Sequence, residues 1–97
     1  MLRFISLVTV RDGTDVDAIV EAGAAMCRDD PDIEDGTVAA GLGLMRAAGA
    51  PEASYAMVLD FVDADAMDRW AVGPAHQELL QVVGDAVESF VVAEVAI

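Results

Sequence analysis

Lysine is absent from this sequence, and cysteine and histidine occur only once each, as Cys27 and His76. A lone cysteine excludes a disulfide within the chain and a cysteine-based metal cluster, so we expect Cys27 to be a small core residue on the first helix. A lone histidine likewise excludes a site built from several histidines of one chain, and no glycine-rich phosphate-binding motif occurs. The sequence therefore predicts neither a metal nor a cofactor.

Positive charge is also scarce, because five arginines stand against eighteen acidic residues and give a formal net charge of −13. Nucleic acids and anionic membrane surfaces would repel such a chain, so neither is expected as a partner. The apolar residues come in runs too short to cross a bilayer, and the first residues lack the basic and apolar regions of a signal peptide. We therefore expect a cytoplasmic protein.

What the sequence does contain is a series of short apolar runs with turn residues between them. Strands are expected over residues 2–10, 37–45, 54–62 and 90–97. A helix follows the first strand, where Thr14 with Asp17 three residues later resembles a capping box. A second helical segment starts after Asp63, is broken at residues 73–74, and then continues to Val87.

This order, β-α-β-β-α-β, is that of a ferredoxin-like α+β fold. It places the helices on one face of a four-stranded antiparallel sheet, within a single domain covering residues 1–97. The strands are apolar on both faces, so the face without helices also needs cover. Two copies packed sheet to sheet would supply that cover, and we expect a homodimer.

The segment Gly-Pro-Ala-His-Gln at residues 73–77, followed by an amphipathic helix and the strand FVVAEV, resembles an element of the stress-responsive dimeric α/β-barrel (Dabb) family. The strand LRFISLVTV and the segments DGTVAAGLG and AMVLDF fit the family's order, so the resemblance covers essentially the whole chain. It implies a ferredoxin-like protomer and a dimer whose two sheets form a barrel. Known members include stress-induced plant proteins and a plant polyketide cyclase.

In that cyclase, the histidine matched by His76 is thought to be the general base of an aldol-type ring closure. A tyrosine and a second histidine assist it, and Trp70 and Phe4 stand at their positions here. Of the three polar groups of that cyclase site, the resemblance therefore carries over only the histidine, as His76. Tyr55, the only tyrosine, is a candidate replacement for the missing phenol.

His76 shares a helical face with Leu79, Leu80 and Val83, so its ring is expected to point inward. One interpretation is an acid/base group, since imidazole exchanges protons near neutral pH. The other is a structural histidine that bonds a backbone carbonyl and docks its helix. Phe4, Trp70 and Leu80 are the expected pocket-lining residues, and the Trp70 indole has one hydrogen bond to donate.

Asp60 and Glu94 are acids within otherwise apolar strands. They have two interpretations, as a pair of carboxylates that exchange protons or as rim residues that pair with Arg3 or Arg46.

Two functions from different classes follow. In the first, the protein is a cofactor-free cyclase, lyase or isomerase for a small, mostly apolar, oxygenated molecule such as a polyketide or aromatic intermediate. His76 would move a proton α to a carbonyl, with backbone amides or Tyr55 stabilising the enolate oxygen. In the second, it is a non-catalytic stress-related or ligand-binding dimeric barrel. An open cavity at the His76 ring favours the first, and a ring packed against Leu80 and Trp70 favours the second.

The charge balance gives a first testable prediction. Because most of the acidic side chains repel one another on the surface, raising NaCl from about 20 mM to about 200 mM should raise the melting temperature by several degrees. Calorimetry at neutral pH measures this. A melting temperature that falls as salt is added would mean that attractive pairs dominate instead.

Overall fold

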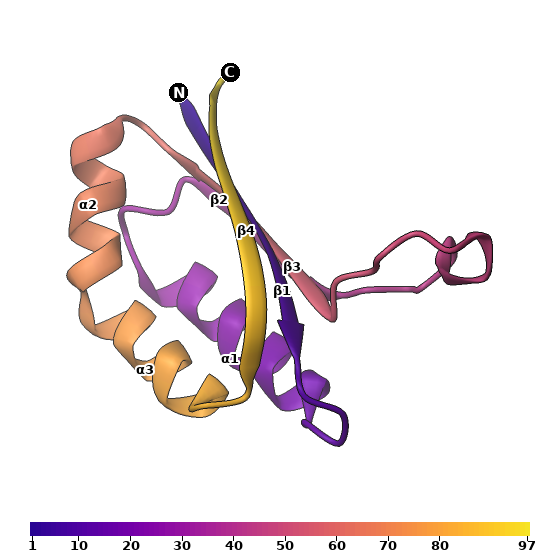
Figure 1. The fold of residues 1–97 in the computed structure, drawn as a ribbon. Coiled ribbons are helices and arrows are strands. Elements are labelled where there is room, and N and C mark those ends of the chain that lie inside the picture. The colour runs from indigo at the N-terminus through magenta and orange to yellow at the C-terminus, as the bar shows by residue number, and fades with distance from the viewer.

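The computed structural model describes all 97 residues. Its elements in chain order are β1 (Leu2–Val10), α1 (Val16–Asp29), β2 (Asp35–Ala40), a short 3-10 helix (Arg46–Ala48), β3 (Tyr55–Phe61), α2 (Ala64–Val72), α3 (Pro74–Val83) and β4 (Val87–Ala96). The strands form one antiparallel sheet in the order β2-β3-β1-β4. All three main helices lie on one side of it (Figure 1), which confirms the predicted fold class.

The second strand differs from the prediction, because β2 ends at Ala40 rather than at residue 45. At Gly41 the chain passes close to the opposite backbone, and its N–H donates to the Ser54 carbonyl at 2.8 Å. A Cβ placed on Gly41 would lie 2.3 Å from the Ala53 carbonyl oxygen, so only glycine fits there. The close approach of the Ala53 backbone therefore explains why a glycine stands at this position.

Two helix ends also differ from the prediction. Asp15, not Thr14, caps α1, and its Oδ1 accepts the Ala18 N–H at 3.1 Å. Val87 begins β4 instead of ending α3, and β4 therefore starts three residues before the expected Phe90. The reason is Gly84, which has a φ of 59° and whose N–H closes the helix on the Leu80 carbonyl at 2.9 Å.

The core lies between the sheet and the helices. Alternate residues of the two central strands point into it, and Leu59 and Phe61 of β3 are fully buried. Trp70 of α2 packs against Phe61 with ring centroids 5.4 Å apart. α1 approaches β2 so closely that a Cβ on Gly23 would lie 2.7 Å from Val38. None of the helices is long and apolar enough to span a membrane.

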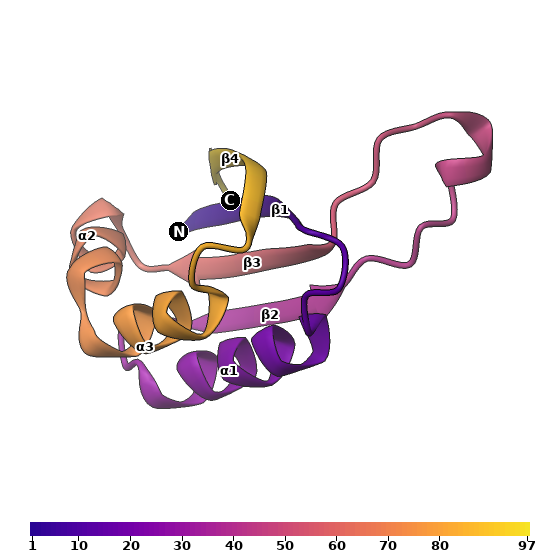
Figure 2. The ribbon, with the colours of Figure 1, turned by 60° about the horizontal axis from the view of Figure 1, so that its bottom comes forward.

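The other face of the sheet has no helices over it. Side chains of β1 and β4 make it apolar, and Leu7, Val91 and Val95 are 45%, 67% and 42% exposed. The β2–β3 connection, residues 41–54, projects from the end of the sheet toward this same side, away from the helices (Figures 1 and 2). Leu42 and Leu44 on this arm are 81% and 78% exposed.

One ion pair lies on this open face. The Arg3 guanidinium donates two hydrogen bonds to Asp60, at 2.8 and 3.0 Å, and the two residues are cross-strand partners. These hydrogen bonds hold the pKa of Asp60 below its ordinary value, and the pKa of Arg3 is raised for the same reason. Glu94 pairs with Phe4 and therefore lies on the opposite face. The pairing of Asp60 with Arg3 is confirmed, and the proposed pair of carboxylates is wrong.

The lowered pKa of Asp60 sets a pH dependence. Because its pKa is lowered in the folded state, the ionised Asp60 carboxylate stabilises the fold fully at pH values above the ordinary pKa of 3.8. This stabilisation is lost as the pH falls through the lowered pKa. Asp60→Asn should therefore lower the melting temperature by a few degrees at neutral pH. The difference from wild type should persist to about pH 4 and shrink only below it. Asp12→Asn, which removes an exposed acid, is the control and should leave the melting temperature unchanged or raise it slightly. Equal melting temperatures for Asp60→Asn and wild type at neutral pH would contradict the prediction.

Candidate functional site

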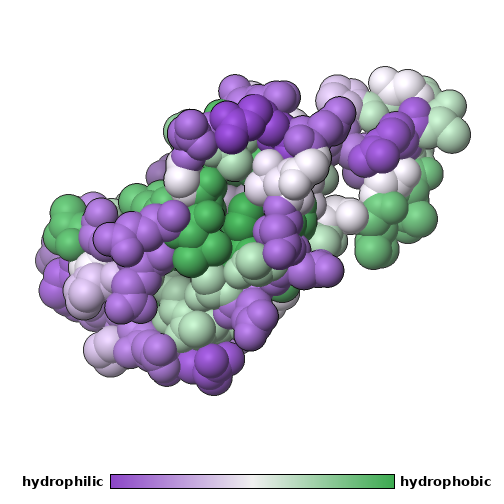
Figure 3. All heavy atoms as spheres, turned by 90° about the horizontal axis from the view of Figure 1, so that it is seen from below, coloured by the Kyte–Doolittle hydropathy of each residue, from purple (hydrophilic) through white to green (hydrophobic).

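A cavity of about 430 Å³ lies between the helix-facing side of the sheet and the helices α2 and α3. Twelve of the fourteen residues that line it are hydrophobic. The lining residues are Phe4, Ser6, Val8, Tyr55, Met57, Trp70, Ala71, His76, Leu79, Leu80, Val83, Val87, Phe90 and Val92. Leu80 and Phe90 are 46% and 65% exposed, so the cavity opens between α3 and β4. Seen from below, the molecule shows hydrophobic surface in the middle of this side, bordered by hydrophilic side chains (Figure 3).

Trp70 forms one wall of this cavity. Its indole meets the Phe4 ring edge-on, with centroids 5.2 Å apart, and lies nearly parallel to the His76 ring at 4.2 Å. The indole N–H is directed into the core, where it donates to the Met26 sulfur at 3.3 Å. The hydrogen bond foreseen for Trp70 is therefore used inside the protein, and its contribution to the cavity is an apolar surface.

His76 is held in the first turn of α3 by the break between the two helices. Because α2 ends at Val72, the carbonyl of Ala71 has no partner within its own helix. The His76 Nδ1 lies 2.9 Å from that oxygen. A carbonyl only accepts, so Nδ1 carries the hydrogen, and in the neutral ring Nε2 keeps its lone pair. The ring is thus fixed by one hydrogen bond and one stacking contact, and a single nitrogen remains to accept a proton.

The open cavity and the Trp70 contact, which were to favour different functions, are present together. The cavity reaches His76, and the ring also packs against Trp70. The hydrogen bond to a backbone carbonyl, foreseen for a structural histidine, orients the ring without occupying Nε2.

Two buried hydroxyl groups also border the cavity. Ser6 and Tyr55 are 4% and 3% exposed, and neither hydroxyl has a hydrogen-bond partner within the chain. No side-chain nitrogen or oxygen is both fully buried and unpaired, so these two oxygens face the cavity space. Burial raises the pKa of Tyr55, which keeps its phenol protonated and able to donate.

Sequence reasoning missed Ser6. A serine inside an apolar strand attracts no attention by itself, although alternation along the strand places it on the same side as Phe4 and Val8. The residues predicted to be catalytic or pocket-lining, Phe4, Tyr55, Trp70, His76 and Leu80, all line this one cavity.

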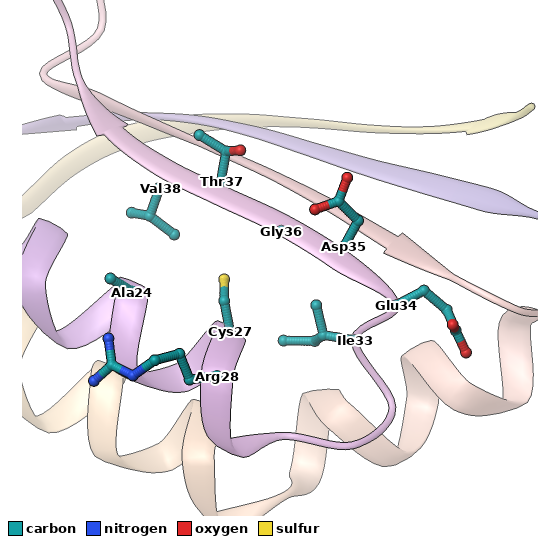
Figure 4. Close-up of a pocket in the computed structure, with 9 residues that line it drawn as sticks. All are labelled: Ala24, Cys27, Arg28, Ile33, Glu34, Asp35, Gly36, Thr37 and Val38. Carbon is teal, nitrogen blue, oxygen red and sulfur yellow. The ribbon is translucent and has the colours of Figure 1, made fainter.

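Cys27 lies elsewhere, in a second hollow of about 440 Å³ between α1 and β2. Figure 4 shows its sulfur pointing into the gap with Ile33 and Val38, while Asp35 and Thr37 project from the other side of β2. Burial, reinforced by Asp35, raises the pKa of the Cys27 thiol, which disfavours the reactive thiolate. No cluster of three or more metal-ligating side chains occurs in the structure. The candidate site is therefore the cavity at His76, where the residues predicted from the sequence meet.

The chain matches no protein-family model, and no curated protein matches it in sequence. Many solved structures share its fold, among them the three that follow. A dimeric ferredoxin-like protein of unknown function from Thermobifida fusca matches with a TM-score of 0.84 and 21% identity, over 99% of this chain and 90% of that chain. Hydroxynitrile lyase from Passiflora edulis gives 0.80 and 17%, over 99% and 92%. SnoaB, a cofactor-independent oxygenase from Streptomyces nogalater, gives 0.71 and 14%, over 99% and 91%. At these identities the likeness establishes a ferredoxin-like fold.

Proposed function

We propose that this protein is a cofactor-free acid/base enzyme, cyclase- or isomerase-like, for a small and mostly apolar carbonyl compound such as a polyketide or aromatic intermediate. The observation that carries the proposal is the His76 ring. Its Nδ1 is bound to the Ala71 carbonyl at 2.9 Å, and its unpaired Nε2 belongs to a ring on the wall of an apolar cavity. A fixed base on the wall of an apolar cavity is suited to removing a proton from carbon.

In this proposal, Nε2 of His76 takes a proton from the carbon next to the substrate carbonyl. The electron pair of that C–H bond moves to form an enolate. In an isomerisation, the imidazolium then returns the proton to a different carbon. In a ring closure, the enolate carbon attacks a second carbonyl of the same molecule, and the imidazolium protonates the new alkoxide. Neither route consumes an oxidant, reductant or cofactor.

The fold neighbours support a catalytic use of this architecture. One of them is named a hydroxynitrile lyase and another a cofactor-independent oxygenase. The cavity volume of about 430 Å³ is in the range of sites for small organic molecules. Its lining contains no arginine, aspartate or glutamate, which agrees with a neutral and largely hydrocarbon substrate.

A deuterium-exchange experiment tests the proposed base. The protein should accelerate exchange of the protons next to the carbonyl of 1-indanone in D₂O, followed by NMR. His76→Asn should abolish this acceleration, with a loss on the order of 100- to 10,000-fold, because it removes the base. The Asn Nδ2 can still donate to the Ala71 carbonyl, so this variant should melt close to wild type. Exchange by His76→Asn at the wild-type rate would exclude His76 as the base.

The alternative function is a non-catalytic ligand-binding barrel, favoured by the two contacts that hold the His76 ring. In that case the wild type would bind the ketone without exchanging its protons. His76→Ala would then act through stability alone, with a loss of roughly 1–3 kcal/mol. The same NMR samples distinguish the two functions.

We further propose that the protein is a homodimer of the stress-responsive dimeric α/β-barrel (Dabb) type. The proline–alanine–histidine–glutamine segment at residues 74–77 and the dimeric fold neighbours support this assignment. The open sheet face, with Leu7 and Val91 paired across two strands, is the surface that a second copy would cover. Sheet-to-sheet packing would place the 41–54 arm of each protomer beside its partner.

Light scattering after size exclusion tests the dimer. At micromolar concentration the mass should be twice the 10.1 kDa of one chain. Leu7→Glu, which puts a charge on the open face, should shift the protein toward monomer. Val82→Glu is the matched control, because Val82 is 49% exposed on α3 and lies away from that face. A monomeric wild type, or equal dissociation in both variants, would contradict the proposal.

A further inference from the structure

We infer that the hydroxyl groups of Ser6 and Tyr55 form an oxygen-binding subsite on the sheet side of the cavity, which takes the carbonyl oxygen of a neutral ketone or aldehyde. This inference rests on the proposed function and names the group that the substrate must present. It assigns the two hydroxyls a role distinct from that of His76, because they bind oxygen and His76 moves a proton.

The placement of the two residues comes from the strand register. Tyr55 of β3 pairs with Val8 of β1, and Ser6 pairs with Met57. Ser6 and Tyr55 are therefore diagonal neighbours on adjacent strands, and both lie on the helix-facing side of the sheet. Both line the same cavity as His76, which belongs to the opposite, helical wall.

Their lack of partners is what points to a ligand. Buried hydroxyl groups are normally hydrogen-bonded, because an unpaired polar group in apolar surroundings costs free energy. As whole residues Ser6 and Tyr55 are only 4% and 3% exposed, and neither hydroxyl has a hydrogen-bond partner inside the chain. Because no unpaired side-chain oxygen is fully buried, both hydroxyl oxygens remain in contact with open space beside the cavity walls. Among the surrounding residues of the sheet side, Phe4 and Val8 have no polar side-chain group, and neither hydroxyl donates to the Met57 sulfur. A ligand oxygen would supply the missing partner.

The chemistry of the two hydroxyls selects the kind of oxygen. The Tyr55 phenol stays protonated and donates, and the serine hydroxyl also donates, so together they suit an acceptor with two lone pairs. A carbonyl oxygen is such an acceptor. A carboxylate or phosphate is disfavoured, because no arginine lines the cavity and the protein carries a net charge of −13. The rest of the ligand should be hydrocarbon or aromatic, to match the other walls.

This subsite would also orient the substrate for proton transfer. With the carbonyl oxygen bound on the sheet side, the adjacent carbon lies between the sheet and α3, where His76 forms the wall. Negative charge that develops on the oxygen in the enolate would strengthen both hydrogen bonds as the proton leaves.

A binding comparison that involves no turnover tests the subsite. The probes are 1-indanone and indane, which have similar shapes but differ in the carbonyl oxygen, and affinities are measured by NMR titration. Ser6→Ala and Tyr55→Phe should each weaken 1-indanone binding by roughly 3- to 10-fold, the effect of one lost hydrogen bond. The affinity of each variant for indane should stay within about twofold of the wild-type value, since indane has no oxygen to accept a hydrogen bond from either hydroxyl. Ser89→Ala, which removes a hydroxyl from β4 on the open face, is the matched control and should change neither affinity.

The outcomes separate this inference from the proposed function. If both variants keep the wild-type ratio of ketone to hydrocarbon affinity, or if the wild type does not bind the ketone, the subsite is excluded. If the ratio falls in the variants but the wild type shows no His76-dependent deuterium exchange, the subsite stands and the catalytic proposal fails. If deuterium exchange depends on His76 but the ratio of ketone to hydrocarbon affinity is unchanged in the variants, the catalytic proposal stands and the subsite is excluded. Should one variant fail to fold, the other decides the result.

Discussion

The hydrogen bond between His76 and the Ala71 carbonyl is the interaction on which the candidate site depends. It exists because a helix is interrupted. Gly73 and Pro74 end α2 and restart the chain as α3, which leaves the Ala71 carbonyl without an intrahelical partner. His76 satisfies that oxygen with Nδ1 at 2.9 Å and is thereby turned with its ring against Trp70. A continuous helix would have used the same carbonyl internally and left the imidazole free to rotate.

The same break shapes the cavity. α2 places Trp70 in the core, against Phe4 and Phe61, while α3 takes a separate path toward the start of β4. Because β4 continues away from α3, the space between them stays open and is bounded mainly by aliphatic side chains. The polar groups within it are few, so each one has a large influence on which molecules can enter. Apolar walls supply affinity for hydrocarbon, and the hydroxyls and the imidazole supply selectivity.

The sequence predicted the fold well because its signals are local. The caps and breakers at Asp63, Gly73 and Pro74 act within one helical turn, and each lies where the structure has it. Strand periodicity gave the two central strands for the same reason. The end of β2 was wrong because it depends on a contact between Gly41 and Ala53, across a loop whose path the sequence pattern does not define. Val87 fitted a helical spacing and was placed in the helix, but the positive φ of Gly84 ended the helix first.

The site was predicted less completely. Helical phase and the family resemblance both drew attention to His76, and alternation was enough to group Tyr55 with the core. Neither principle identifies Ser6, because its importance comes from having no partner, and that is a property of the folded surroundings. The Arg3–Asp60 pair was among the alternatives left open and was decided by strand register alone.

The stacking of Trp70 on His76 has a consequence for spectroscopy. Trp70 is the only tryptophan in the chain, so all indole fluorescence comes from a ring whose centroid lies 4.2 Å from that of the imidazole. Because Trp70 also lines the cavity, the emission of the unlabelled protein originates at the wall of the site and should change when a ligand fills the space beside the indole.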